Sequence, residues 1–358
     1  MTYEKLTKLM GLLLVVILVG TLGLGMIGCG DDDDDGDDGD GLPGDGVTVS
    51  PGRATWNTGY FQAEITVLAL QELGYNVERP TELDNSAFYV SVAQGDLDYW
   101  PNGWFPLHNT YLTDDVRAKV SLVGYLAKGG ALQGYLIDKA TSEEYDITNI
   151  DQFKDPEIAE LFDADGNGKA DLVACPPGWG CEKVITHHMD AYDLSDTVEP
   201  LTVDYAIGMA DAITRYNKGE SIFFYTWTPN WTVNALVPGE DVVWLEVPYP
   251  DLPEEQKDLE DATSLPGVVG CVDDPCEMGW PANDIRIVAN KDFLSDNPAA
   301  RALFEAMEIP LEDIFAQNAK MNEGENSEED VIRHAEEWVE GNQAMFNAWI
   351  SQAMTAAD

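Results

Sequence analysis

The fold is decided by the stretch of residues 47–77, which reads VTVSPGRATWNTGYFQAEITVLALQELGYNV. Its two ends, at residues 47–49 and 75–77, have the short apolar pattern of β-strands. Between them Gly74 suits a helix C-terminus because it has no side chain, and apolar residues precede it at helical spacing, namely Phe61, Ile65, Leu68 and Leu73. The stretch predicts a strand, a helix and a second strand in succession.

The same alternation continues along the chain. One helix is predicted at residues 205–216, and further strands at 135–137, 222–225, 242–245 and 285–288. The C-terminal region has apolar stripes typical of helices, formed by Ala335, Trp338, Val339, Phe346 and Trp349. Roughly 310 residues follow the N-terminal region, which is more than one hydrophobic core usually serves. We therefore predict an α/β protein with two lobes, and the sequence contains no internal repeat.

The N-terminus has the pattern of a bacterial lipoprotein export signal. Lys5 and Lys8 precede an apolar run over residues 10–24, and small residues then lead to Cys29. We expect residues 1–28 to be removed and Cys29 to carry a lipid, which holds the protein outside the cytoplasmic membrane. The alternative is an uncleaved membrane helix, because the run approaches the length that spans a bilayer.

The charge of the chain is strongly acidic. Residues 29–45 are rich in Asp and Gly and predict a solvated, flexible tether. The whole chain has 66 acidic and 19 basic residues, giving a formal net charge of −47, more than the tether alone supplies. Such a charge excludes nucleic acid as a partner and disfavours contact with anionic lipid, so the membrane is met only through the lipid anchor. We expect a monomer.

The five cysteines divide into one lipid attachment point and two short-range pairs. Cys175 pairs with Cys181, and Cys271 pairs with Cys276, as expected for an oxidising compartment. Metal binding is the rival interpretation, but neither spacing is that of a CxxC zinc site. The first ring encloses Trp179 on a Pro/Gly loop, and we expect this indole to face solvent as part of a recognition surface.

Residues 163–171 resemble the first part of a calcium loop. Oxygen ligands recur at every second position, and a glycine occupies the sixth: Asp163, Asp165, Asn167, Gly168, Lys169 and Asp171. Position twelve is Ala174, so the usual bidentate glutamate is missing. The loop predicts either a structural calcium site or a surface turn held by Asx hydrogen bonds. No other cofactor is required.

Several motifs resemble those of the glycine betaine/proline betaine binding proteins of osmoprotectant ABC transporters. They are Gly95–Asp98 with Trp104–His108, Gln133–Asp138, Pro177–Glu182, Tyr225–Pro229 and Asn297–Ala300, and the resemblance runs from Gly46 to the C-terminus. It implies a two-lobed periplasmic binding-protein fold of type II whose cleft closes on the ligand. We place the crossings near Gln133 and Leu245, so that lobe one comprises residues 46–133 and 246–358 and lobe two comprises residues 134–245.

The resemblance also implies the site residues. Trp104, Trp179 and Trp227 form an aromatic cage, which suits a trimethylammonium group because such a cation has no proton to donate and is best met by indole faces. From the residues themselves, a helix that begins at Cys181 and Glu182 places the backbone N–H groups of Gly180 and Cys181 at its N-terminus, where they suit the ligand carboxylate. His108 matches the family position that helps to hold this carboxylate, and the alternative is an ordinary capping or surface histidine. Trp100 and Trp231 lie next to these candidates and are more simply core residues.

The sequence as a whole predicts the lipid-anchored substrate-binding component of an osmoprotectant importer. Glycine betaine is the first expected ligand and proline betaine the second, with an ABC transporter permease as partner. Choline or carnitine is the alternative within this class. An enzyme is disfavoured, because His187 and His188 point to different sides of a helix and no HExxH, GxSxG or phosphate-loop motif occurs. A calcium-dependent surface lipoprotein remains the third class.

Overall fold

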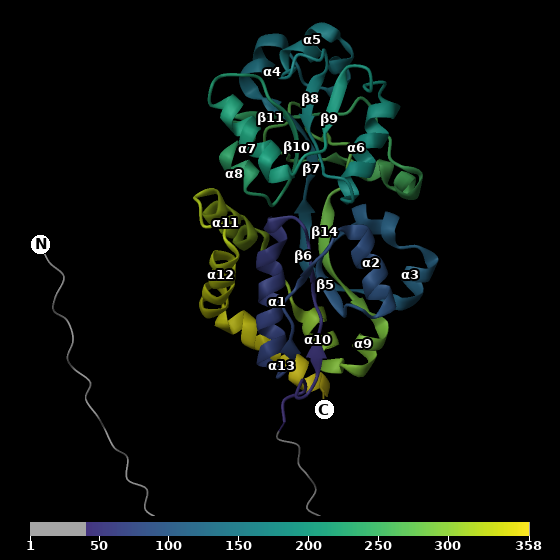
Figure 1. Ribbon diagram of the computed structural model, residues 1–358, viewed down its shortest axis with the longest axis vertical. Coiled ribbons are helices and arrows are strands. Elements are labelled where there is room, and N and C mark those ends of the chain that lie inside the picture. The colour runs from purple at the N-terminus through teal and green to yellow at the C-terminus, as the bar shows by residue number, and fades with distance from the viewer. Residues whose placement is uncertain (1–40, 358) are drawn as a thin grey trace, which may run out of the picture. The chain divides into compact units, whose positions relative to one another are not determined.

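The structure is a computed structural model that describes residues 41–357. The predicted signal peptide, the lipid attachment at Cys29 and most of the predicted tether lie outside the described residues. Residues 41–357 form two lobes, one below the other in Figure 1, and each lobe has a central β-sheet with helices on both sides. Among the residues that the structure describes, no helix combines the length and apolar character needed to cross a bilayer.

The first lobe is built on a three-stranded antiparallel sheet in the order β5-β14-β6. Two short parallel pairs, β1 with β3 and β2 with β4, lie beside it. The strands are β1 (Thr48–Val49), β2 (Gly52–Arg53), β3 (Asn76–Val77), β4 (Thr81–Glu82), β5 (Tyr99–Phe105), β6 (Val120–Ala131) and β14 (Asn283–Asn290). The helices are α1 (Tyr60–Glu72), α2 (Asn85–Gln94), α3 (Asp114–Lys119), α9 (Lys291–Asp296), α10 (Pro298–Ala306), α11 (Leu311–Asn322), α12 (Glu328–Gly341) and α13 (Gln343–Ala357), with the 3-10 turns η1 (Asn57–Gly59) and η2 (Leu107–Tyr111).

The unit predicted from residues 47–77 is present in this lobe. β1, α1 and β3 follow one another, and β1 pairs with β3 in parallel. Gly74 has a φ of +87°, and a Cβ atom there would lie 2.7 Å from the Cβ atom of Leu42. Because side-chain-bearing residues rarely adopt that φ, glycine is required where the chain leaves the helix.

The second lobe is built on a five-stranded sheet in the order β11-β7-β10-β8-β9. β7 is antiparallel to both of its neighbours, whereas β10, β8 and β9 are parallel. The strands are β7 (Gln133–Asp138), β8 (Ala170–Val173), β9 (Val198–Leu201), β10 (Phe223–Trp227) and β11 (Val242–Leu245), with the hairpin β12 (Ser264–Leu265) and β13 (Cys276–Glu277). The helices are α4 (Lys139–Tyr145), α5 (Pro156–Leu161), α6 (Gly180–Ala191), α7 (Tyr205–Tyr216) and α8 (Thr232–Ala235), with η3 (Ile150–Lys154) and η4 (Glu254–Ala262).

The chain crosses between the lobes at two places. The first lies at Leu132, between β6 and β7, close to the expected position at Gln133. We expected the return near Leu245, but residues 246–282 stay with the second sheet: the N–H of Glu246 donates to the carbonyl of Thr148, and the N–H of Val247 donates to the carbonyl of Glu277. The return therefore lies near the start of β14. We call residues 41–131 and 283–357 lobe one, and residues 133–282 lobe two.

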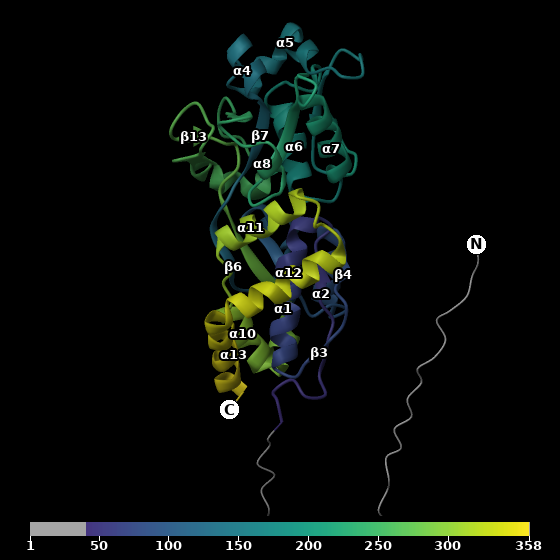
Figure 2. The same cartoon turned by 90° about the vertical axis from the view of Figure 1, so that its left-hand side faces the viewer.

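The C-terminal helices cover the outer side of lobe one. Figure 2 shows α11 and α12 in front of α1, with α13 beside α10. Trp338 of α12 stacks on Trp349 of α13 at 5.8 Å between ring centroids and meets Phe61 of α1 edge-on at 6.3 Å. The predicted apolar stripes are therefore packing contacts between helices on the outer side of lobe one.

Candidate functional site

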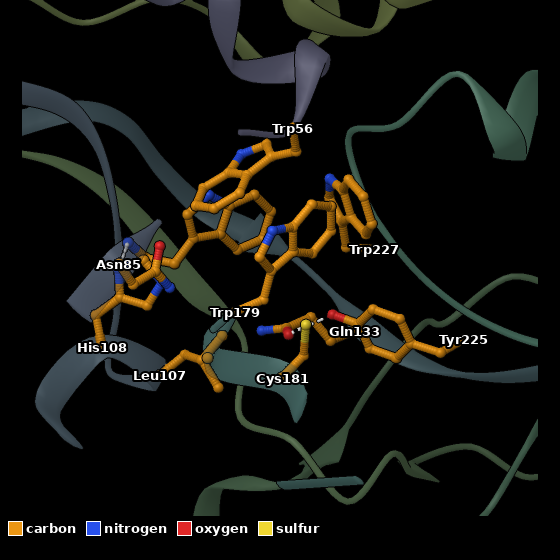
Figure 3. Close-up of a pocket in the computed structure, with 11 residues that line it drawn as sticks. Trp56, Asn85, Leu107, His108, Gln133, Trp179, Cys181, Tyr225 and Trp227 are labelled. Carbon is orange, nitrogen blue, oxygen red and sulfur yellow. Dashed lines mark hydrogen bonds between the residues drawn. The ribbon is translucent and has the colours of Figure 1, made fainter. Parts of the chain in front are cut away.

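A pocket lies between the lobes (Figure 3), and both lobes contribute to its wall. Lobe one supplies Trp56, Asn85, Trp104, Leu107 and His108, and lobe two supplies Gln133, Trp179, Gly180, Cys181, Tyr225 and Trp227. All six predicted ligand-binding residues thus line the same pocket. Five further residues, Trp56, Asn85, Leu107, Gln133 and Tyr225, were not predicted from the sequence.

The ends of regular elements position the wall of the pocket. In lobe one, Trp104 is the penultimate residue of β5, and His108 lies in the 3-10 turn η2 that follows. In lobe two, Trp227 is the last residue of β10 and is paired in register with Gln133, the first residue of β7. Trp179 is the N-cap residue of α6. Because these positions terminate strands or begin a helix, their side chains meet at the cleft.

Four indoles form the apolar part of the wall. The ring centroid of Trp179 lies 5.2 Å from that of Trp56 and 5.5 Å from that of Trp227, both in edge-to-face geometry. Figure 3 shows Trp56, Trp179 and Trp227 turned toward one another. Trp104 is tied to Trp56 because the side-chain oxygen of Asn102 accepts both indole N–H groups, at 2.8 and 2.9 Å.

The expectation that Trp179 faces solvent was wrong, since the side chain is only 8% exposed. Lobe one covers the disulfide ring, and the Nε1–H group of Trp179 donates to Thr55 Oγ1 at 2.8 Å. Trp100 is fully buried and stacks on the His108 ring at 5.7 Å, as a core residue does. Trp231 does not line the pocket.

The start of α6 supplies hydrogen-bond donors to the pocket. Helix α6 begins at Gly180, and its N-cap residue Trp179 makes no side-chain cap within the described chain, so the first backbone N–H groups have no cap partner. A Cβ atom on Gly180 would lie 3.0 Å from Leu107 Cγ and 3.1 Å from His108 Cδ2, so a larger residue would press on lobe one. The Cys175–Cys181 disulfide closes the preceding loop with 6.0 Å between Cα atoms.

His108 is a neutral, buried side chain at the same end of the pocket. Burial lowers the pKa of His108 to about 3, which keeps the ring uncharged at neutral pH. The backbone N–H of Trp104 donates to Nδ1 at 3.2 Å, and the Tyr89 hydroxyl lies at the same distance from this nitrogen. Nε2 lies 3.1 Å from the side-chain nitrogen of Asn85, and the side-chain oxygen of Asn85 is buried without a partner among residues 41–357.

Gln133 and Tyr225 complete the wall in lobe two. The Tyr225 hydroxyl donates to Gln133 Oε1 at 2.7 Å, which leaves Gln133 Nε2 buried with no acceptor among the described residues. Burial raises the pKa of Tyr225 well above its ordinary value, so the phenol is neutral. None of the eleven described residues that line the pocket carries a formal charge, although the chain as a whole is strongly acidic.

The remaining sequence candidates lie away from this pocket. His187 pairs with Asp251 at 2.7 Å on the surface side of α6, whereas His188 is buried and bonded to the Tyr135 hydroxyl at 3.0 Å. The two histidines therefore serve separate contacts. The structure forms both predicted disulfides, and the Cys271–Cys276 bridge does not line the pocket.

Comparison with known proteins gives consistent results. A family model described as the substrate binding domain of the ABC-type glycine betaine transport system matches residues 47–341. The chain is 47% identical over 317 residues to a glycine betaine-binding periplasmic protein of Dickeya dadantii, covering 88% of this chain and 92% of that protein. It is 45% identical over 316 residues to the glycine betaine/proline betaine-binding periplasmic protein of Escherichia coli, with the same coverage of both chains. These relatives are substrate-binding proteins of ABC transporters and not enzymes.

Solved structures of lower sequence identity share the fold. A glycine betaine, L-proline-binding protein from Borrelia burgdorferi superposes with a TM-score of 0.66 at 19% identity, covering 87% of this chain and all of that one. A lactococcal protein in its closed-liganded conformation with glycine betaine gives a TM-score of 0.63 at 18% identity, covering 85% of this chain and 99% of that one. The two-lobed periplasmic binding-protein fold predicted from the sequence is thus confirmed. By its sequence and its fold, the chain belongs to the family of substrate-binding domains of ABC-type glycine betaine transport systems.

Proposed function

We propose that the protein captures glycine betaine, or the related proline betaine, in the pocket between its lobes. The observation that carries the proposal is the composition of the wall: four indoles on one side, uncapped helix N–H groups on the other, and no formal charge on any described lining residue. A betaine carries a quaternary ammonium and a carboxylate and has no net charge. An uncharged wall with an aromatic end and a donor end matches that molecule.

The cation is assigned to the indole faces. Trp104, Trp179 and Trp227 surround it, and Trp56 adds a fourth aromatic wall from lobe one. A quaternary ammonium has no N–H group, so hydrogen-bond acceptors contribute little to its binding free energy. A desolvated cation–π contact, in contrast, is worth roughly 2 kcal/mol. All four indoles are between 5% and 8% exposed, so water competes little for the cation.

The carboxylate is assigned to the start of α6. The N–H groups of Gly180 and Cys181 point from a helix N-terminus, where an anion meets unpaired donors and the positive end of the helix dipole. His108 lies beside Gly180 and helps to hold the carboxylate with a ring that burial keeps neutral. Because the Cys175–Cys181 bridge and the Gly180 contact with lobe one fix this turn, little conformational freedom is lost on binding.

Ligand capture is coupled to lobe closure and to transport. The ligand contacts Trp104 and His108 from lobe one and Trp179 and Trp227 from lobe two, so it stabilises the arrangement in which the lobes are together. This closed form delivers the betaine to the permease of the importer for osmoprotection. A lipid on Cys29 keeps the protein at the outer side of the cytoplasmic membrane, in line with relatives that are named periplasmic proteins.

Isothermal titration calorimetry with glycine betaine, proline betaine, carnitine and choline tests this proposal. One betaine should bind per protein. Choline has the same cation but no carboxylate, so it loses the bonds to Gly180 and Cys181 and should bind at least about tenfold more weakly, which corresponds to about 1.4 kcal/mol. Tighter binding of choline than of either betaine would contradict the assignment of the donor end, and failure of all four ligands to bind would contradict the function.

A further inference from the structure

The loop of residues 163–171 in lobe two lies outside the ligand pocket and connects α5 with β8. One carboxylate oxygen from each of Asp163, Asp165 and Asp171 lies within 4.8 Å of the other two. The loop also contains Lys169, but its ammonium is directed away and donates to the carbonyl of Ser195 at 2.7 Å. Three carboxylates are therefore gathered at the start of β8, and the ammonium of Lys169 is bound elsewhere.

Internal hydrogen bonds explain only part of this arrangement. Asp163 accepts the backbone N–H groups of Gly166, Asn167 and Gly168 at 2.7 to 3.2 Å, and Asp165 also accepts that of Asn167. These bonds belong to an ordinary Asx-rich turn. They do not involve Asp171, whose carboxylate is tied to the loop by the N–H of Ala164.

The buried carboxylate of Asp171 is the second observation that indicates a bound cation. The residue is only 4% exposed, its Oδ2 atom accepts the N–H of Ala164 at 2.8 Å, and its Oδ1 atom is buried without a partner among the described residues. A buried carboxylate that is gathered with two others and has one oxygen without a hydrogen-bond donor is costly unless a cation compensates it.

The chemistry of the donors selects the ion. All ligand atoms on offer are oxygens, which suits a hard cation and disfavours zinc, for which histidine or thiolate is the usual ligand. Asn167 and the carbonyl of Lys169 occupy the positions that supply an amide and a backbone oxygen in calcium loops. Ala174 occupies position twelve and offers no carboxylate. Glu199 on β9 is the strand partner of Asp171, and its carboxylate accepts a side-chain N–H of Asn167.

We propose that residues 163–171 bind one calcium ion through the carboxylates of Asp163, Asp165 and Asp171. The ion sits where β8 begins, and β8 leads through Ala174 into the Cys175–Cys181 ring that bears Trp179. Calcium therefore ties the start of this strand to the loop before it. The site is separate from the betaine pocket, so its test does not depend on the proposed transport function.

The test is calcium titration of the full-length protein after removal of divalent ions by a chelator. Excess Mg²⁺ and moderate salt in every buffer mask diffuse binding to the acidic surface, because Mg²⁺ demands tighter octahedral geometry and dehydrates reluctantly. Asp171→Asn is the test variant, since the asparagine oxygen can still accept the N–H of Ala164. Asp196→Asn is the matched control, because it removes the same charge from an exposed position of the same lobe.

Wild-type protein should bind one calcium ion per molecule with saturation, and calcium should raise its Tm. Asp196→Asn should behave in the same way. Asp171→Asn should bind calcium at least about tenfold more weakly, lose most of the Tm shift and still bind betaine, which shows that it is folded. Binding by wild-type protein without saturation, or equal calcium affinity in Asp171→Asn and wild type, would overturn the proposal.

Discussion

Replacing Trp179 by alanine removes the indole that stands between two others in the pocket. Its ring centroid lies 5.2 Å from that of Trp56 and 5.5 Å from that of Trp227. A desolvated cation on an indole face is worth roughly 2 kcal/mol. Since each 1.4 kcal/mol is a factor of ten in Kd, the Trp179→Ala substitution, which also loses the bond to Thr55, should raise the Kd for glycine betaine by at least about 30-fold.

The Trp179→Phe variant separates the aromatic face from the hydrogen bond between lobes. Phenylalanine keeps a π face but cannot donate to Thr55, so it loses an interaction worth about 1 kcal/mol and should raise Kd only about fivefold. Isothermal titration at fixed salt and pH measures both variants. The matched control is Trp338→Ala on the outer side of lobe one, which should lower Tm through lost packing and leave Kd unchanged.

The outcome that refutes the aromatic cage is specific. It is a Trp179→Ala protein with a cooperative unfolding transition and a Kd within about twofold of the wild-type value, a difference of about 0.4 kcal/mol. Such a result would mean that the cation lies elsewhere. A large loss in Trp179→Phe equal to that in Trp179→Ala would instead show that the bond to Thr55, and not the indole face, dominates.

Three other predictions concern the surroundings of the ligand. Trp56→Ala should raise Kd by at least about tenfold, and Trp56→Phe by less, if the fourth indole contacts the cation; titration of both variants checks this. Replacing the Cys175–Cys181 pair by serines should weaken betaine binding more than the same change in Cys271–Cys276, and equal losses in titrations of the two double variants would argue against a fixed donor turn. Burial lowers the pKa of His108 to about 3, so the ring stays neutral and Kd should be constant from pH 8 to pH 5; an affinity that rises as pH falls through about 6.5 would show that the ring instead gains a proton to pair with the carboxylate.

The response to salt forms a fifth prediction. The ligand has no net charge and no described residue of the wall is charged, so Kd should change little as sodium chloride is added. The fold should respond differently, because a net charge of −47 repels itself in dilute buffer and is screened by salt, so Tm should rise. A steep loss of affinity with salt would indicate that an exposed charge pair dominates binding.

Local sequence patterns predicted much of the fold. The spacing of Phe61, Ile65 and Leu68 before Gly74 identified α1 and its end, and the predicted helix at residues 205–216 has the bounds of α7. The return between the lobes could not be placed in the same way. It depends on bonds such as that from Val247 to Glu277, which join residues far apart in sequence and leave no local periodicity.

In the candidate site too, residues in local motifs could be predicted, whereas residues placed by contacts distant in sequence could not. Trp104, His108 and Trp227 could be named because each lies in a recognisable motif at the end of a strand. Trp56 could not be named, because it lies in a loop and its indole is held by Asn102, a residue of β5 that is distant in sequence. The burial of Trp179 was likewise hidden, since the covering residues come from the opposite lobe.

The most direct test of the account is a crystal structure of the protein with glycine betaine bound. We expect the trimethylammonium group against the faces of Trp104, Trp179 and Trp227, and the carboxylate within hydrogen-bonding distance of the N–H groups of Gly180 and Cys181. A ligand bound in the reverse orientation, or with its cation against a carboxylate outside this pocket, would contradict it.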